Sequence, residues 1–309
     1  MYKELFIFVV AFYMVIKGST MATKYAGQLA KSFNLSKYVV GFIIVAIISI
    51  LPETFISINS ALNDASSLGL GMLFGSNVAD LTLIFAIIIW SAKRNLKVES
   101  KILKKQSVYP FMLLLPLFFS FNGYLSRWEG IILIVVGIFF YYMTLRDNDE
   151  LKMRVKSEDG KLKNIIGLLL SMAILLIGSH FVITSATSIA NILKINSIII
   201  GMLVIGLGTT IPELFFSLHS IKKHDDSLAI GDLLGTVLAD ATIVVGILAL
   251  INPFSFPQKT VYTTGIFMVV ASFILFHFMR TGKCLSKREA FYLFIFWLIF
   301  AFTEIMINI

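Results

Sequence analysis

Residues 51–53 read Leu-Pro-Glu and residues 211–213 read Ile-Pro-Glu, and each triplet stands in the middle of a long apolar stretch. A carboxylate at membrane depth is costly and marks a functional position by default. A proline in a spanning helix frees a backbone carbonyl, which a neighbouring group must then satisfy. The same interval separates each glutamate from a second acid, Asp80 or Asp240. The four acids therefore mark a predicted functional centre inside a membrane.

Composition supports this interpretation. The chain has 309 residues, of which 58% are hydrophobic and only 14% are charged. In soluble domains, about a quarter of the residues are charged. We therefore predict a polytopic protein of the lipid bilayer. The net charge of +8 lies in short loops rather than on a basic face, so nucleic acid is not an expected partner. The single cysteine, Cys284, excludes an internal disulfide and a thiolate metal site, and we expect no resident cofactor.

Ten apolar runs are long enough to cross a bilayer core of about 30 Å. They cover approximately 5–23, 38–62, 69–91, 107–121, 128–145, 164–188, 197–221, 228–252, 260–280 and 288–308. Lysine and arginine concentrate in the loops that follow the odd-numbered runs, which places those loops in the cytoplasm by the positive-inside rule. Because ten is an even number, both termini lie on the same side of the membrane. With the basic loops in the cytoplasm, that side is predicted to be the outer one.

The chain also contains an internal repeat. Residues 41–82 align with 201–242 without gaps at a constant offset of 160, and the alignment matches both Pro-Glu pairs and both aspartates. Five helices per repeat is an odd number, so the second copy enters the membrane from the opposite side. We predict an all-α integral membrane protein of two inverted five-helix repeats, an arrangement that places a binding site near the bilayer midplane. The predicted parts are 1–145, a cytoplasmic linker at 146–163, and 164–309.

Hydroxyls share the helix faces of the four acids. The spacing of four residues, which stacks side chains on one face of a helix, recurs in Ser49-Glu53-Ser57, Thr209-Glu213-Ser217, Ser76-Asp80 and Thr236-Asp240. Carboxylates, hydroxyls and free carbonyls are hard oxygen ligands, which suit Ca²⁺ or Na⁺ better than zinc or copper. The pattern therefore predicts a site for transported cations.

These motifs carry a resemblance to a known family. The first pair is Ile50-Leu51-Pro52-Glu53-Thr54 with Gly75-Ser76-Asn77-Val78-Ala79-Asp80, and the second is Gly208-Thr209-Thr210-Ile211-Pro212-Glu213 with Gly235-Thr236-Val237-Leu238-Ala239-Asp240. They look like the two α-repeats of the cation/calcium exchanger superfamily, in its sodium/calcium branch. The resemblance implies a sodium/calcium exchanger-like fold, and an antiporter, not an enzyme, that exchanges Na⁺ for Ca²⁺ by alternating access.

The resemblance also implies a set of metal ligands between the second, third, seventh and eighth helices. Glu53 and Glu213 would be the central Ca²⁺ ligands, and the first and sixth helices would slide across them. The full expected set is Glu53, Glu213, Asp80, Asp240, Ser49, Thr209, Ser76, Thr236, Ala46, Gly206, Thr210 and Asn77.

Two departures from the family pattern concern the coupling ion. Ile48 and Ile50 replace a glycine and a hydroxyl that Gly208 and Thr210 keep in the second repeat. Both middle positions are aspartate, where many sodium/calcium exchangers have one asparagine, and an extra buried carboxylate must be protonated or matched by a cation. Coupling to K⁺ or H⁺ therefore stays open as an alternative, as does exchange of another divalent ion.

Other functions account for less of the pattern. An intramembrane aspartyl protease needs a Gly-x-Gly-Asp signature and leaves the duplicated Pro-Glu unexplained, and a passive channel does not require inverted halves. A purely structural role, as buried acids bonded to a neighbouring helix, does not explain why Glu53 and Glu213 are duplicated, each directly after a proline. We expect Asp232 to cap the start of the eighth helix and Glu304 to be solvated. The oligomeric state is left open.

Overall fold

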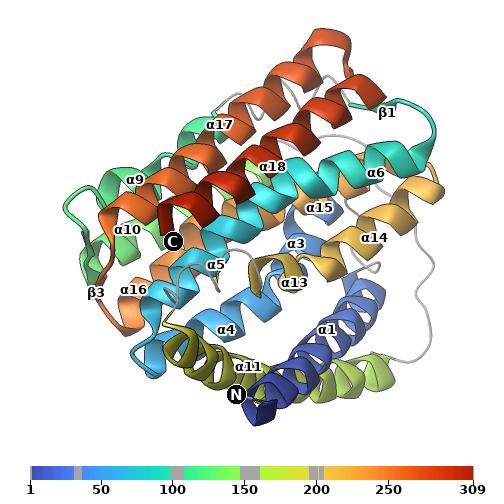
Figure 1. Cartoon of the computed structure of the whole chain (residues 1–309). Helices are drawn as coiled ribbons and strands as arrows, with labels where there is room; N and C mark the ends of the chain where they lie inside the picture. The colour runs from blue at the N-terminus through green and yellow to red at the C-terminus, as the bar shows by residue number, and fades with distance from the viewer. Residues whose placement is uncertain are drawn as a thin grey trace.

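The chain folds into long helices, several of which break where the sequence carries its prolines and acids (Figure 1). The structure, a computed structural model, describes residues 2–30, 37–98, 108–146, 161–194, 201 and 205–308. The first half contains α1 (Tyr2–Ala30), α2 (Lys37–Val39), η1 (Val40–Val45), α3 (Ala46–Ser49), α4 (Leu51–Leu62), α5 (Ser66–Ala79), η2 (Asp80–Ile84), α6 (Phe85–Ala92), β1 (Leu96–Lys97), α8 (Tyr109–Met112), α9 (Leu115–Phe119), β2 (Tyr124–Leu125) and α10 (Arg127–Arg146). The second half contains α11 (Lys161–Leu193), α13 (Gly206–Thr209), α14 (Ile211–Lys222), α15 (Asp226–Ala239), η4 (Asp240–Val244), α16 (Val245–Ile251), β3 (Phe254–Ser255), α17 (Gln258–Gly282), β4 (Cys284–Leu285) and α18 (Lys287–Asn308).

The membrane fold predicted from hydropathy is confirmed. Within the described residues, five helices are long and apolar enough to span a membrane, and the pair Gly41–Ser49 with Leu51–Leu62, bent by 44°, makes a sixth. Described helices occur in all ten predicted runs. The run at 107–121 is not one continuous helix, because α8 and α9 are separate and Pro116 occupies the first turn of α9, where its missing N–H costs nothing. Most of the predicted linker, at 147–160, lies outside the described residues.

The two halves repeat their local structure at the offset of 160 residues. Left-handed backbone occurs at Asp64 and His224, and again at Gly123 and Lys283. Two capping boxes, in which a serine and a glutamate satisfy each other's backbone N–H groups, begin α10 and α18; they are formed by Ser126 with Glu129 and by Ser286 with Glu289. The repeat detected around the acids therefore extends to the last helix of each half.

Two small antiparallel ribbons join the halves to each other. β1 of the first half pairs with β4 of the second, and β2 of the first half pairs with β3 of the second. α17 runs from β3 to β4, so its 25 residues separate the ribbons by on the order of 37 Å at about 1.5 Å per residue. The ribbons thus lie at opposite ends of the bundle, as a two-fold axis in the membrane plane requires.

Glycine permits the close crossings between the repeats. A methyl group at Gly41 would lie 2.3 Å from the carbonyl oxygen of Leu228, and one at Gly201 would lie 2.4 Å from that of Leu68. The two contacts are related by the same offset of 160 residues. Small residues at such crossings let backbones approach closely, so η1 packs directly on α15. This brings the acid-bearing helices of one repeat against those of the other.

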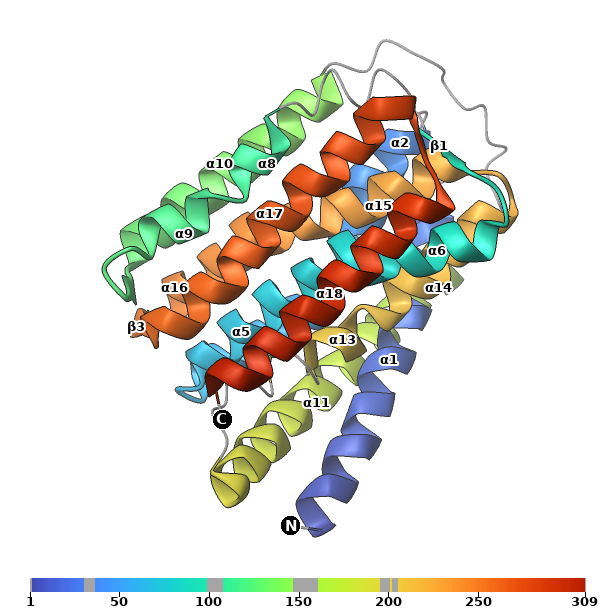
Figure 2. The ribbon, with the colours of Figure 1, turned by 45° about the horizontal axis from the view of Figure 1, so that its top comes forward.

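α1 and α11 pack against each other along one flank of the bundle (Figure 1 and Figure 2). Gly178 of α11 lies against Ala11 and Val15 of α1. The Phe12 ring of α1 lies over Gly208, where a methyl group would come within 1.3 Å of the ring. α1 therefore touches the second repeat next to Glu213.

Candidate functional site

The four predicted acids are all buried at the breaks in their helices. Glu53 and Glu213 lie in the first turns of α4 and α14, and Asp80 and Asp240 begin the π-helical turns η2 and η4. Their exposed fractions are 1% or less. The proline before each glutamate is the second residue of the new helix and has no N–H to give to the preceding turn. π-turns are rare and occur often at functional sites, so the local backbone supports the predicted positions.

Most oxygens of these acids lack a partner. Within the described residues, Glu53 Oε2 and both carboxylate oxygens of Asp80, Glu213 and Asp240 are buried without a hydrogen bond. Nearby hydroxyls in the same condition belong to Ser57, Ser217 and Thr236. Buried polar groups in folded proteins are nearly always paired, and each exception needs an explanation such as a bound ion. These oxygens form a donor set suited to a hard cation.

The carboxylates act on one another across the repeats. Asp80 interacts electrostatically with Glu53, and Glu213 interacts with Glu53 and Asp80. Asp240 in turn interacts with Glu53 and Asp80. In the described part of the chain, no three acid, histidine or cysteine side chains form a group that holds a metal ion by themselves. A cation among them therefore needs hydroxyl and carbonyl oxygens as well.

The predicted hydroxyl ligands differ in where they give their protons. Thr209 lies beside the carboxylate of Glu53. The hydroxyls of Ser76, Thr209 and Thr210 donate within their own helices, over 2.9 to 3.1 Å, to the carbonyls of Leu73, Gly206 and Leu207. Ser49 instead donates across the repeats, to Asp232 Oδ1 at 3.1 Å. A hydroxyl that donates its one proton keeps its lone pairs as acceptors.

The three remaining predicted ligands, Ala46, Gly206 and Asn77, already take part in hydrogen bonds within the protein. The carbonyl of Ala46 accepts a helical hydrogen bond from the N–H of Ile50 at 3.0 Å and has a second lone pair. The carbonyl of Gly206 accepts from both the N–H of Thr210, at 3.3 Å, and the hydroxyl of Thr209, at 3.1 Å. The Asn77 amide is buried and donates to the sulfur of Met268 on α17, at 3.5 Å. Asn77 thus faces α17, and its role as an ion ligand stays a prediction.

Asp232 is not a helix cap, contrary to expectation. α15 begins six residues earlier, at Asp226, so Asp232 lies in the helix interior, where it is fully buried. The hydropathy pattern predicts a start at residue 228, which is too late, because the charged Asp226 in the first turn lowers the local hydropathy. With Met72 at the matching position of the first repeat, the duplication gave no signal for Asp232.

Glu304 is also buried rather than solvated, contrary to expectation, and its carboxylate accepts a hydrogen bond from Thr264 of α17 at 2.7 Å.

Two buried tyrosines near the acids were not predicted from the sequence, because aromatic residues in such an apolar chain are expected mainly to face lipid. Tyr109 and Tyr141 are buried and donate to the α15 carbonyls of Leu234 and Gly235, each at 2.6 Å. They attach α15, the helix that ends just before Asp240, to α8 and α10.

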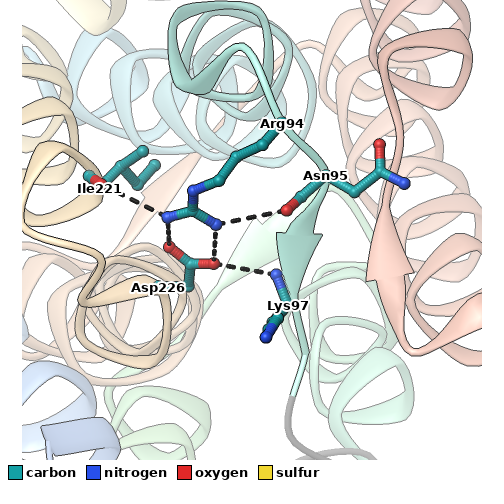
Figure 3. A network of polar contacts seen from close by, with 5 residues as sticks. All are labelled: Arg94, Asn95, Lys97, Ile221 and Asp226. Atoms are coloured by element: carbon teal, nitrogen blue, oxygen red, sulfur yellow. Dashed lines mark hydrogen bonds and ion pairs between the residues drawn. The ribbon is translucent and has the colours of Figure 1, made fainter.

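The first residue of α15 is held by an arginine from the other repeat (Figure 3). Both Nη atoms of Arg94 lie 2.6 Å from the carboxylate oxygens of Asp226, and the Lys97 N–H donates to the same carboxylate at 2.9 Å. Arg94 also donates to the carbonyl of Ile221, near the end of α14, at 3.4 Å. The network joins the ends of α6, α14 and α15.

Comparison with known proteins agrees with this architecture. The family described as sodium/calcium exchanger protein matches residues 3–146 and 163–306 of the chain. The sodium/calcium exchanger MaX1 of Methanosarcina acetivorans is 25% identical over 330 aligned positions, covering 93% of this chain and 94% of MaX1. The inner membrane protein YrbG of Escherichia coli is 26% identical, covering 79% of each chain.

Two solved structures share the fold. The sodium-calcium exchanger NCX_Mj, in crystals soaked with Na⁺ and Sr²⁺, superposes with a TM-score of 0.71 at 20% identity and with 96% of each chain covered. An H⁺/Ca²⁺ exchanger, CAX, superposes with a TM-score of 0.81 at 14% identity, covering 98% of this chain and 87% of CAX. The chain therefore belongs to the sodium/calcium exchanger protein family of multi-pass membrane exchangers.

Proposed function

We propose that this protein is a secondary-active antiporter of the cell membrane that exchanges Na⁺ for Ca²⁺. One observation carries the proposal: four acids from both repeats are buried with seven carboxylate oxygens lacking a hydrogen-bond partner in the described residues. Such oxygens are costly without a compensating charge, and a transported cation supplies that charge. The relative MaX1, which is named a sodium/calcium exchanger, matches nearly the whole chain.

In this proposal Glu53 and Glu213 bind Ca²⁺ together, aided by the hydroxyls of Ser49 and Thr209. Ca²⁺ takes six to eight oxygen ligands in flexible geometry, and the two glutamates begin helices of opposite repeats. The Ala46 and Gly206 carbonyls, with the hydroxyls of Ser76, Thr236 and Thr210, complete the cation sites. Asp80 and Asp240 flank the centre.

Alternating access is assigned to α1 and α11. These two helices pack mainly on each other, and α1 reaches α13 and α14 of the opposite repeat. A paired movement of α1 and α11 across α4, α5, α14 and α15 would open the acids to one side of the membrane and then to the other. Because the repeats are inverted, an approximate two-fold rotation about an axis in the membrane plane relates the two states.

Proton-coupled or K⁺-dependent Ca²⁺ exchange is the second candidate, and it is favoured by one feature, the aspartate at both middle positions, Asp80 and Asp240. Ca²⁺ uptake into proteoliposomes under separately imposed Na⁺, K⁺ and pH gradients distinguishes the candidates. We expect the Na⁺ gradient alone to drive uptake and Glu213→Gln to abolish it. Uptake driven only by a pH gradient would overturn Na⁺ coupling, and normal uptake by Glu213→Gln would overturn the site.

A further inference from the structure

Asp232 is a fifth fully buried acid near the predicted site, and nothing in the repeat accounts for it. It lies two turns before Asp240 on α15, with no exposed surface. Oδ1 accepts the hydrogen bond from Ser49 at 3.1 Å, and Oδ2 has no hydrogen-bond partner within the described ranges. Across the described residues, no lysine or arginine forms a salt bridge with it. Its charge therefore has no compensating partner from the protein there.

The contact with Ser49 orients an oxygen toward a cation. A serine hydroxyl has one proton and two acceptor lone pairs. Because that proton goes to Asp232, the lone pairs of Ser49 Oγ stay free to bind a positive ion. Thr209, at the matching position, gives its proton to the carbonyl of Gly206 in its own helix. Thr209 also contacts the Glu53 carboxylate of the first repeat, so each hydroxyl meets an acid of the opposite repeat. The acid that Ser49 meets, Asp232, has no counterpart at the offset of 160 residues.

The pair stands where the first repeat is poor in ligands. Ile50 replaces the hydroxyl that Thr210 carries in the second repeat. Asp232 also acts electrostatically on Asp80 and Glu213, so its charge influences the predicted site. Met72 occupies the equivalent position on α5, and the extra oxygen therefore exists on one side only.

We propose that Asp232 and Ser49 form a cation subsite that crosses between the repeats and takes a monovalent alkali cation. One carboxylate with a neutral hydroxyl matches a single positive charge, whereas Ca²⁺ sites usually gather more charge and more oxygens. The subsite rests on the proposed function, because it supplies one of the co-transported ions. It makes the ion-binding region asymmetric although the fold is nearly two-fold symmetric.

The test uses the full chain, purified and reconstituted, with three single variants and the double variant of Asp232→Asn and Ser49→Ala. Asp232→Asn keeps an acceptor for Ser49 but removes the charge, and Ser49→Ala removes the hydroxyl. Glu304→Gln is the matched control, because Glu304 is also a buried carboxylate that accepts from a hydroxyl but lies on α18. Thermal unfolding of each variant establishes that it folds.

Two readouts decide the outcome: equilibrium binding of Na⁺ and K⁺, and Ca²⁺ binding in the absence of alkali ions. We expect Asp232→Asn to weaken alkali-ion binding by about tenfold, the usual scale for losing one charged contact, and to leave Ca²⁺ affinity within about twofold. Ser49→Ala should also weaken alkali-ion binding; its Ca²⁺ affinity is no criterion, because the Ser49 hydroxyl is also proposed to aid Ca²⁺ binding. The double variant should bind alkali ions no more weakly than Asp232→Asn, and Glu304→Gln should match the wild type.

Unchanged alkali-ion binding in a folded Asp232→Asn, or an equal loss of Ca²⁺ and alkali-ion affinity, would overturn the subsite. If Asp232→Asn does not fold, Asp232→Ser, which also removes the charge, decides by the same criteria. Failure of the proposed function is separate, because it shows in the wild type as an absence of Na⁺-driven Ca²⁺ uptake. The equilibrium binding measurements judge the subsite in that case too.

Discussion

Arg94 and Asp226 form a two-pronged ion pair between the repeats, with both nitrogen–oxygen distances at 2.6 Å. Asp226 is 7% exposed and Arg94 29%, so the pair is partly protected from water. The hydrogen bonds that Arg94 donates to Asp226 raise the pKa of its guanidinium above the ordinary value. The contribution of Arg94 is therefore present throughout the neutral range and is lost only as the pH rises past that raised pKa.

Removing this arginine should destabilise the junction of α6, α14 and α15. We expect Arg94→Ala to lower the free energy of unfolding by about 1–3 kcal/mol, since it leaves a largely buried carboxylate without its charged donor. Arg94→Lys should recover less than half of that loss, because an ammonium does not reproduce the fork of two parallel bonds. Denaturant unfolding in detergent measures both. Arg280→Ala, at an exposed arginine, is the control, and an equal loss there would contradict the prediction.

The Phe12–Gly208 contact should control the rate of exchange. An added methyl group at Gly208 would lie 1.3 Å from the Phe12 ring, so Gly208→Ala must displace this ring from α13. Overpacking of this kind costs about 1–3 kcal/mol, and we expect Ca²⁺ exchange in proteoliposomes to slow by about tenfold. The double variant with Phe12→Ala should recover much of the rate. If Phe12→Ala gives no recovery, the loss does not come from this contact.

The two aspartates should set the co-ion requirement rather than Ca²⁺ binding. Asp80→Asn or Asp240→Asn removes one buried negative charge, and a charge in a low-dielectric site must be balanced by a proton or a cation. We expect each variant to retain Ca²⁺ exchange while its dependence on co-ion concentration becomes less steep. Initial rates measured against Na⁺, K⁺ and pH give the steepness. Complete loss of Ca²⁺ binding in Asp80→Asn would make that residue a primary Ca²⁺ ligand instead.

The single cysteine offers a test of orientation. Cys284 lies in β4, at the opposite end of α17 from β3, and the charge distribution predicts that its end faces the cytoplasm. We expect a membrane-impermeant maleimide to label Cys284 only from the cytoplasmic side. Asn122→Cys in a Cys284→Ser background should be labelled only from outside, because Asn122 is exposed near the other ribbon. Reversed labelling would invert the predicted topology.

Much of the architecture can be predicted from the sequence alone. Hydropathy and the offset of 160 residues were enough to predict the membrane fold, the inverted halves and the four buried acids, because burial in lipid and duplication both leave periodic traces in sequence. The Pro-Glu pairs also indicate helix breaks, since proline removes a backbone donor at a known place. The limits of α1 and α11 were less accurate, as each extends into polar residues beyond its apolar run.

The pairing of side chains across helices was decided only in three dimensions. Asp232 with Ser49, Glu304 with Thr264, and Arg94 with Asp226 each join residues far apart in the sequence and lack a counterpart at the offset of 160. Which face of a helix meets which neighbour depends on its rotation and crossing angle, and these are set by close packing at positions such as Gly41 and Gly235. The sequence by itself determined that acids would lie within the membrane. The tertiary structure decided which of them face the other repeat, because only packing of the two halves brings those partners into contact.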